Sequence, residues 1–185
     1  VGLHGIVGTV NVKSSSGDVK LSKTNGASVN LVTGSGDIHL DTVDARTIDV
    51  SSSSGDQYIL NLNAEELQLA SVSGDIHCDL GGVSGHVKVD SATGWSDVTL
   101  HGPVGPTSVS VHSVSGDCSL SVLDSIGITA KVVSRTGNVS IPQTFTHQVP
   151  GHYEGTSGSE PFHDLSIVTV SGDVTMHVTS SLDRQ

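Results

Sequence analysis

The sequence is poor in aromatic and basic residues. Only 3% of its 185 residues are Phe, Trp or Tyr, and eight Lys and Arg stand against 19 Asp and Glu, which gives a net charge of −11. Proteins that bind nucleic acid gather Lys and Arg on one face, so this composition argues against a nucleic-acid partner. No apolar run approaches the roughly 18 residues of a transmembrane helix, so we expect no membrane insertion by this segment.

Residues that favour helices are also scarce. Ser, Val, Gly and Thr together make up just over half of the chain. Gly shows no three-residue period, which excludes collagen, and the many Val residues do not fit simple disorder. The composition therefore predicts an all-β protein.

A Ser-Gly-Asp motif recurs along the chain. Its intact copies are residues 16–18, 35–37, 54–56, 73–75, 115–117 and 171–173, and two degenerate copies are Thr93–Asp97 and Thr136–Asn138. The glycines of the eight copies are separated by 19, 19, 19, 20, 22, 21 and 35 residues. Segments of alternating apolar residues, such as Val29-x-Leu31 and Ile38-x-Leu40, flank the motifs and read as half-buried strands.

A strict period favours a solenoid, because each coil must lie on the previous coil in register. We therefore predict a single-domain β-solenoid over residues 1–185, with about eight coils of 19 to 22 residues. A β-sandwich of meandering hairpins is the alternative fold. The first strand lacks the start of its coil, so we expect a fragment of a longer chain and end-to-end self-association as a further option.

The Ser-Gly-Asp corners have a structural and a functional interpretation. Gly supplies a positive φ, and Ser and Asp hydrogen-bond the backbone in turns. The alternative is a stacked acidic ladder that binds calcium, because carboxylates one coil apart would repel by about 3–4 kcal/mol at an effective dielectric of 20. The ladder residues are Asp18, Asp37, Asp56, Asp75, Asp117 and Asp173.

The repeats resemble the putative-adhesin family of domains of unknown function. Close matches to its repeat are Val72–Ile76, Val114–Asp117 and Val170–Val174. The resemblance implies a glycine- and serine-rich β-solenoid that is envelope-associated or exported, with no agreed enzymatic activity and hence no catalytic residues to assign. Departures at Gly94–Asp97 and Asn138 weaken any role that needs an unbroken ladder.

Residues 142–164 break the period, and we expect an irregular loop insertion there. A flap over the core is one interpretation, and a partner-binding loop is another, because long loops on regular scaffolds carry binding residues. The loop candidates are Phe145, His147, His152, Tyr153, Glu154, Phe162 and His163. Three of these histidines with Glu154 and Asp164 could also supply a metal site, although their spacing matches no known metal motif.

Two further residue types stand out. His39 and His77 fall at outward strand positions, in one column with Lys20, Tyr58 and Thr99, and we expect them to be solvent-facing. Cys78 and Cys118 fall at inward positions two coils apart, beyond the reach of a disulfide, so we predict two buried free thiols.

The sequence contains no nucleophile elbow, zinc-protease motif or phosphate loop. We therefore expect a noncatalytic, extracellular or cell-envelope module for adhesion, scaffolding or partner binding, with a protein or glycan as partner and no cofactor other than the calcium of the ladder hypothesis. The alternatives are a carbohydrate-binding or carbohydrate-active β-helix and a calcium-dependent structural repeat.

Overall fold

The computed structural model of the chain describes residues 1–185 except 102–106, 124–126, 143–145, 150, 158–161 and 180–185. None of the described residues is helical, and the strands build one β-solenoid, as predicted. The strands are β1 (Gly2–His4), β2 (Val10–Ser16), β3 (Val19–Ser35), β4 (Ile38–Ser54), β5 (Gln57–Ser73), β6 (Ile76–Leu80), β7 (Gly82–Thr93), β8 (Ser96–Leu100), β9 (Thr107–Ser115), β10 (Cys118–Leu123), β11 (Gly127–Thr136), β12 (Val139–Ser140), β13 (Thr146–Val149), β14 (His152–Ser157), β15 (Phe162–Ser171) and β16 (Val174–Thr179).

Each coil runs from one Ser-Gly-Asp corner to the next and has two walls. Wall 1 follows the corner and contains residues 19–22, 38–41, 57–60, 76–80, 96–100, 118–122, 174–178 and 139–140. Wall 2 precedes the next corner and contains residues 10–16, 29–35, 48–54, 67–73, 87–93, 109–115, 165–171 and 130–136. In β3, β4 and β5 one continuous strand forms both walls and bends at residues with positive φ, which are Lys23, Thr42 and Asn61.

Neighbouring coils pair in parallel and in register with the repeat. Val19 lies opposite Ile38, Ile38 opposite Gln57, and Gln57 opposite Ile76. This parallel pairing excludes the antiparallel sandwich that was the alternative fold, because hairpins would pair successive strands in opposite directions.

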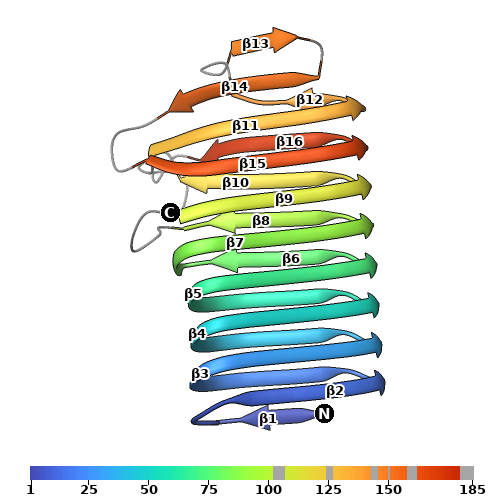
Figure 1. Cartoon of the computed structure of the whole chain (residues 1–185), viewed down its shortest axis with the longest axis vertical. Helices are drawn as coiled ribbons and strands as arrows, with labels where there is room; N and C mark the ends of the chain where they lie inside the picture. The colour runs from blue at the N-terminus through green and yellow to red at the C-terminus, as the bar shows by residue number, and fades with distance from the viewer. Residues whose placement is uncertain (102–106, 124–126, 143–145, 150, 158–161, 180–185) are drawn as a thin grey trace.

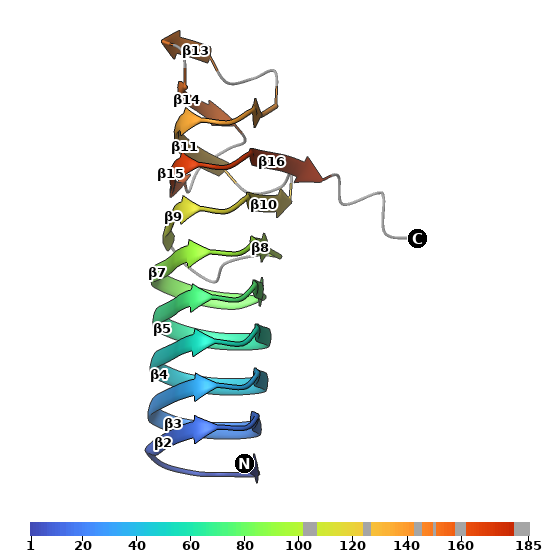
Figure 2. The ribbon, with the colours of Figure 1, turned by 90° about the vertical axis from the view of Figure 1, so that its right-hand side faces the viewer.

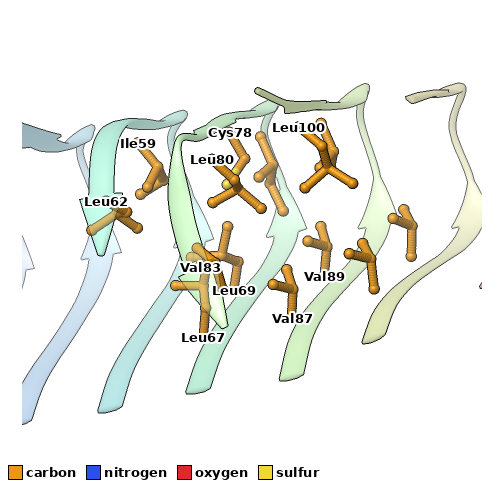
Figure 3. Packing of buried hydrophobic residues seen from close by; sticks show 14 of the residues in the cluster. Ile59, Leu62, Leu67, Leu69, Cys78, Leu80, Val83, Val87, Val89 and Leu100 are labelled. Atoms are coloured by element: carbon orange, nitrogen blue, oxygen red, sulfur yellow. The ribbon is translucent and has the colours of Figure 1, made fainter. Parts of the chain in front are cut away.

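The core is a narrow stack of aliphatic side chains between the two walls (Figure 3). In the coil of β5, Ile59 from wall 1, Leu67 and Leu69 from wall 2 and Leu62 from the bend between them are all buried. Because each coil contributes the same few inward positions, medium-sized aliphatic side chains fill the space and large aromatic residues are not needed.

The last coil in the sequence is not the last coil in the stack. β15 pairs with β9 on one side and with β11 on the other, and β16 likewise lies between β10 and β12. Figures 1 and 2 both show β15 between β9 and β11. The chain therefore builds the coil of β11 and β12 and then returns to insert the coil of β15 and β16 beneath it. The long spacing of 35 residues between Gly137 and Gly172 includes β13 and β14. The sequence prediction stacked every coil on its predecessor, and this is wrong for the final coil.

Two further features differ from the prediction. The solenoid has about six turns rather than about eight coils, because the coils at its two ends are incomplete: β1 has three residues and β12 has two. The 142–164 segment contains β13 and β14, which form an antiparallel hairpin, and β14 pairs with β11 at the end of the stack. This hairpin covers the edge of β11, where the sequence predicted an irregular loop.

Candidate functional site

The Ser-Gly-Asp corners lie on top of one another along the solenoid. The backbone of Gly55 has a φ of +130°, and a Cβ added there would lie 2.4 Å from the carbonyl oxygen of Gly36 in the coil before. No other residue fits both the backbone conformation and the space. The corner glycine is therefore required by the stacking of the coils.

The corner aspartates form a ladder of hydrogen bonds. The backbone N–H of Asp56 donates to Oδ1 of Asp37 at 3.0 Å, and the N–H of Asp75 donates to Oδ1 of Asp56 at 2.9 Å. The other members follow the same pattern, since Asp37 donates to Asp18, Asp173 to Asp117 and Asn138 to Asp173. Each carboxylate thus accepts a backbone N–H of the next coil, and this offsets the repulsion between successive charges.

The ladder is interrupted at Trp95. Its backbone N–H donates to Oδ1 of Asp75 at 2.8 Å, so Trp95 makes the same backbone hydrogen bond to the preceding coil as the ladder aspartates do. Its side chain is an indole and offers no carboxylate to Asp117 in the next coil. The interruption falls at the degenerate copy that the sequence identified.

The described residues contain no group of three or more His, Cys, Asp and Glu side chains placed to hold a metal ion. One oxygen of each ladder carboxylate is already an acceptor for the backbone, and Oδ2 of Asp56 accepts from the hydroxyl of Tyr58 at 3.2 Å. Calcium binding by the ladder stays a prediction. If calcium binds there, adding calcium should raise the melting temperature of the protein.

A column of rings runs along the outside of wall 1. The rings of His39 and Tyr58 are stacked with centroids 4.9 Å apart, and those of Tyr58 and His77 are stacked at 5.3 Å. Trp95 packs with its ring edge-to-face against His77 at 5.7 Å. The column arises because the 19-residue repeat places equivalent outward side chains directly above one another.

The column differs in one member from the sequence prediction. His39, Tyr58 and His77 align with Lys20 as expected, but the next position is Asp97, and Thr99 lies opposite Asp79. Asp97 stands three residues after Gly94, as His77 does after Gly74, so the corner around Trp95 keeps the register of the repeat and contains no extra residues.

Carboxylates surround the rings. His77 Nδ1 lies 3.9 Å from Asp97 Oδ2, and His101 Nε2 lies 2.8 Å from Asp79 Oδ1. The charge of Asp56, together with the hydrogen bond that it accepts, raises the pKa of the Tyr58 phenol above its ordinary value. We call this surface the acidic ring face; it consists of His39, Asp41, Tyr58, His77, Asp79, Trp95 and Asp97.

The loop candidates of the sequence analysis do not form one cluster. Phe145 lies outside the described residues, His147 belongs to β13 and Phe162 to β15. On β14, His152 Nε2 lies 3.0 Å from Glu154 Oε1, and Lys131 Nζ lies 3.6 Å from the same oxygen. Tyr153 packs partly buried against the core.

His163 is a core residue. Its side chain is only 4% exposed, and its Nδ1 accepts a hydrogen bond from the backbone N–H of Thr107 at 3.0 Å. Burial lowers the pKa of its imidazole below the ordinary value, with a smaller opposing effect of Asp164. The buried ring therefore connects β15 to β9. The sequence analysis placed His163 in a partner-binding loop, and this is wrong because the side chain is not accessible to a partner.

Sequence reasoning missed a column of inward hydroxyls. In all eight copies of the corner motif the residue three positions before the glycine is Ser or Thr, namely Ser14, Thr33, Ser52, Ser71, Ser91, Ser113, Ser134 and Thr169. Most are buried, and the hydroxyls of Ser52, Ser71 and Thr169 have no hydrogen-bond partner among the described residues. The fixed offset from glycine could have identified this column.

The two cysteines are buried and free, which confirms the prediction. Cys78 lies opposite Val98, whereas Cys118 lies opposite Ser96, so they occupy different columns. Burial raises the pKa of both thiols, that of Cys118 to about 11 with a contribution from Asp117. Neither is a nucleophile at neutral pH.

Comparison with known proteins places the chain in context. A family model described as Toastrack DUF4097 matches residues 7–177. A solved structure, described as a putative cell adhesion protein from Clostridium sporogenes, is 11% identical and covers 96% of this chain and 93% of that chain, with a TM-score of 0.42. No protein with a curated description matches the chain. In the described part of the chain, no helix is long and apolar enough to cross a membrane.

Proposed function

Because the chain belongs to the Toastrack family, a family of unknown function, we propose that it is a noncatalytic binding module of a cell surface or envelope. Its role is adhesion, scaffolding or partner binding through the acidic ring face. The observation that carries this proposal is the ring column of His39, Tyr58 and His77, which lies on the outside of a regular wall and is surrounded by carboxylates.

The chemistry of this face favours a basic partner. Asp41, Asp79 and Asp97 lie at outward positions of wall 1, and the ladder carboxylates line the adjacent corner. Complementary charge steers association and selects partners, and aromatic residues are enriched at interfaces. A protein surface rich in Lys and Arg would complement the negative charge of this face and could pack against its aromatic rings.

The test is binding to an array of peptides of graded net charge, read at low and at physiological salt. The wild type should retain the basic peptides, and retention should fall as salt is added. The triple variant Asp41→Asn, Asp79→Asn, Asp97→Asn should lose most of this binding.

A matched control removes three charges from outward positions away from the acidic ring face, by Asp44→Asn, Asp49→Asn and Glu66→Gln. This control should bind as the wild type does. Equal loss in both triple variants would mean that net charge alone attracts the peptides, and the proposal would fail.

A glycan is the second candidate partner, and the observation that favours it is Trp95. The two inner rings of the column are covered on their faces by their neighbours, whereas Trp95 ends the column and is 44% exposed. A glycan array read with the wild type and with Trp95→Ala tests this function, and a hydrolysis screen of any bound glycan tests for catalysis. Binding that survives the substitution would exclude Trp95 as the platform.

A further inference from the structure

An elongated apolar groove runs along the outside of wall 2, away from the acidic ring face. It crosses β4, β5, β7, β9 and β15 and encloses about 490 Å³. Its apolar lining consists of Ala70, Val72, Ala92, Val114, Val168 and Val170. Three of these valines are largely uncovered, with exposed fractions of 60% for Val72, 58% for Val114 and 45% for Val170.

The groove follows from the repeat. The outward residue two positions before the corner glycine is Val72, Ala92, Val114 and Val170 in four stacked coils, and the pairing of Ser71 with Ser91 and of Ser91 with Ser113 aligns the first three in one column. The small buried serines of the hydroxyl column lie beneath them. With roughly 4.8 Å between strands, five strands make the groove about 19 Å long.

A cation lies at one end of this column. Ser134 pairs with Thr169 and Thr136 with Ser171, which places Arg135 opposite Val170 on the next strand of the stack. Arg135 is exposed and is one of only eight Lys and Arg in a chain of net charge −11. The charged groups along the groove side are His112 and Asp90, which lie 3.7 Å apart, and Asp90 also pairs with Lys88 at 2.6 Å.

We propose that this groove binds a long-chain fatty acid, with its acyl tail along the valine column and its carboxylate on Arg135. The acyl chains of one leaflet span about 15 Å, half of a hydrocarbon core of about 30 Å, so such a tail fits the length of the groove. A guanidinium recognises a carboxylate through two parallel hydrogen bonds. The single cation at the end of an apolar track matches a molecule with one anionic head.

Other occupants fit less well. A peptide lying across the strands would bring backbone N–H and C=O groups against Val72, Val114 and Val170, which offer them no hydrogen bonds. A second copy of the chain would bring together two molecules of net charge −11. A fatty acid carries its only polar group to Arg135.

The experiment is calorimetric titration of the protein with sodium palmitate below its micellar concentration. Arg135→Gln should weaken binding by about tenfold, because a charge-assisted hydrogen bond is lost, and Arg135→Lys should recover part of the loss. Val114→Asn should weaken binding by about fivefold or more by placing a polar group in the apolar track. Arg46→Gln and Leu60→Asn, both at exposed positions outside the groove lining, are the matched controls and should bind as the wild type does.

Two other ligands separate the contributions of head and tail. Laurate, with four fewer methylenes, should bind about tenfold or more weakly than palmitate. Hexadecanol should bind as weakly to the wild type as palmitate binds to Arg135→Gln. Equal binding of hexadecanol and palmitate, or no effect of Val114→Asn, would overturn the proposal.

Two results would show that the groove binds a different occupant. Binding to phosphatidylglycerol vesicles without binding of free palmitate would identify a membrane surface as the partner. Dimerisation in sedimentation that Val114→Asn abolishes, without palmitate binding, would identify a second copy. Circular dichroism melts of each variant verify that the fold is intact.

Discussion

At the corner glycines two constraints act on the same carbon. Gly55 combines a φ of +130° with a distance of only 2.4 Å between an added Cβ and the carbonyl oxygen of Gly36. The backbone conformation alone costs about 1–3 kcal/mol for a residue other than glycine, and the contact with the Gly36 carbonyl oxygen adds to this cost. The sequence indicated the first constraint, because Ser-Gly-Asp is typical of turns, but the second depends on the stacking of the coils.

We predict that Gly55→Ala destabilises the protein by at least about 2 kcal/mol, which lowers the melting temperature by about 4–8 °C in a domain of this size. The control is Gly81→Ala, because a Cβ at Gly81 meets nothing within 4 Å. Thermal unfolding followed by circular dichroism measures both variants. Equal melting temperatures for the two variants would contradict the stacking argument.

The buried imidazole of His163 links stability to pH. Burial lowers its pKa below the ordinary 6.5, so the unfolded chain takes up the proton at a higher pH than the folded chain does. The stability that neutral His163 contributes is therefore fully present above pH 6.5 and is lost as the pH falls from there toward the folded pKa. Protonation also removes the acceptor for the Thr107 N–H.

Between about pH 7.5 and about pH 5.5, the free energy of unfolding should therefore fall more in the wild type than in His163→Asn. The asparagine keeps an acceptor oxygen near the position of Nδ1 but does not titrate. Urea unfolding at the two pH values gives the comparison. An equal fall in both proteins would show that other groups cause the pH dependence.

At the scale of one element, the aspartate ladder balances repulsion against hydrogen bonding. Successive carboxylates repel by about 3–4 kcal/mol at an effective dielectric of 20, while each accepts a backbone N–H of the next coil. Asp56 shows both effects, since it lies between Asp37 and Asp75 and accepts from the Asp75 N–H at 2.9 Å. The oxygen acceptor is needed at this position, and the charge is not.

Asp56→Asn should accordingly be neutral or slightly stabilising, because the amide oxygen keeps the acceptor and the repulsion is reduced. Asp56→Ala should cost about 1–2 kcal/mol, since the N–H of Asp75 loses its partner. Denaturant unfolding measures the two free energies. A larger loss for the asparagine than for the alanine variant would show that the charge itself stabilises the corner.

The limits of sequence reasoning are also clearest at the element scale. Alternation of Val29, Leu31, Ile38 and Leu40 predicts the walls, because inward and outward residues obey the period of a strand. The hairpin of β13 and β14 was not predicted. Its partner, β11, is already a strand of the repeat, and nothing in residues 146–157 indicates antiparallel pairing with β11. The acidic ring face was visible only as one outward column, because the sequence analysis took Thr99 instead of Asp97 as the member after His77.

At the scale of the whole molecule, the order of the coils could not be predicted from the repeat. Leu165 and Ile167 fit on Val109 and Val111, and Ala130 and Val132 match the same inward pattern. Because these coils have equivalent inward residues, the repeat period alone does not tell which coil stacks on which. The insertion of β15 is defined by its pairing with both neighbours, which only the structure shows.

Disulfide trapping distinguishes this order from sequential stacking. Ser110 lies opposite Ser166, so the variant Ser110→Cys, Ser166→Cys should form an intramolecular disulfide on mild oxidation. Sequential stacking would instead place Ser110 opposite Lys131, which here lies beyond Ser166. The variant Ser110→Cys, Lys131→Cys should therefore keep both new thiols, as counted by mass spectrometry after alkylation. The reverse result would disprove the observed coil order.

The inserted coil also affects how the protein can be made. A growing chain can stack its coils one after another as far as β10, because each new coil finds its neighbour already in place. The coil of β11 and β12 has no such neighbour, since its place in the stack rests on β15 and β16, which are synthesised later. We therefore expect folding during synthesis to stop at β10, and the coil of β11 and β12 to take its place in the stack only after β15 and β16 have been synthesised.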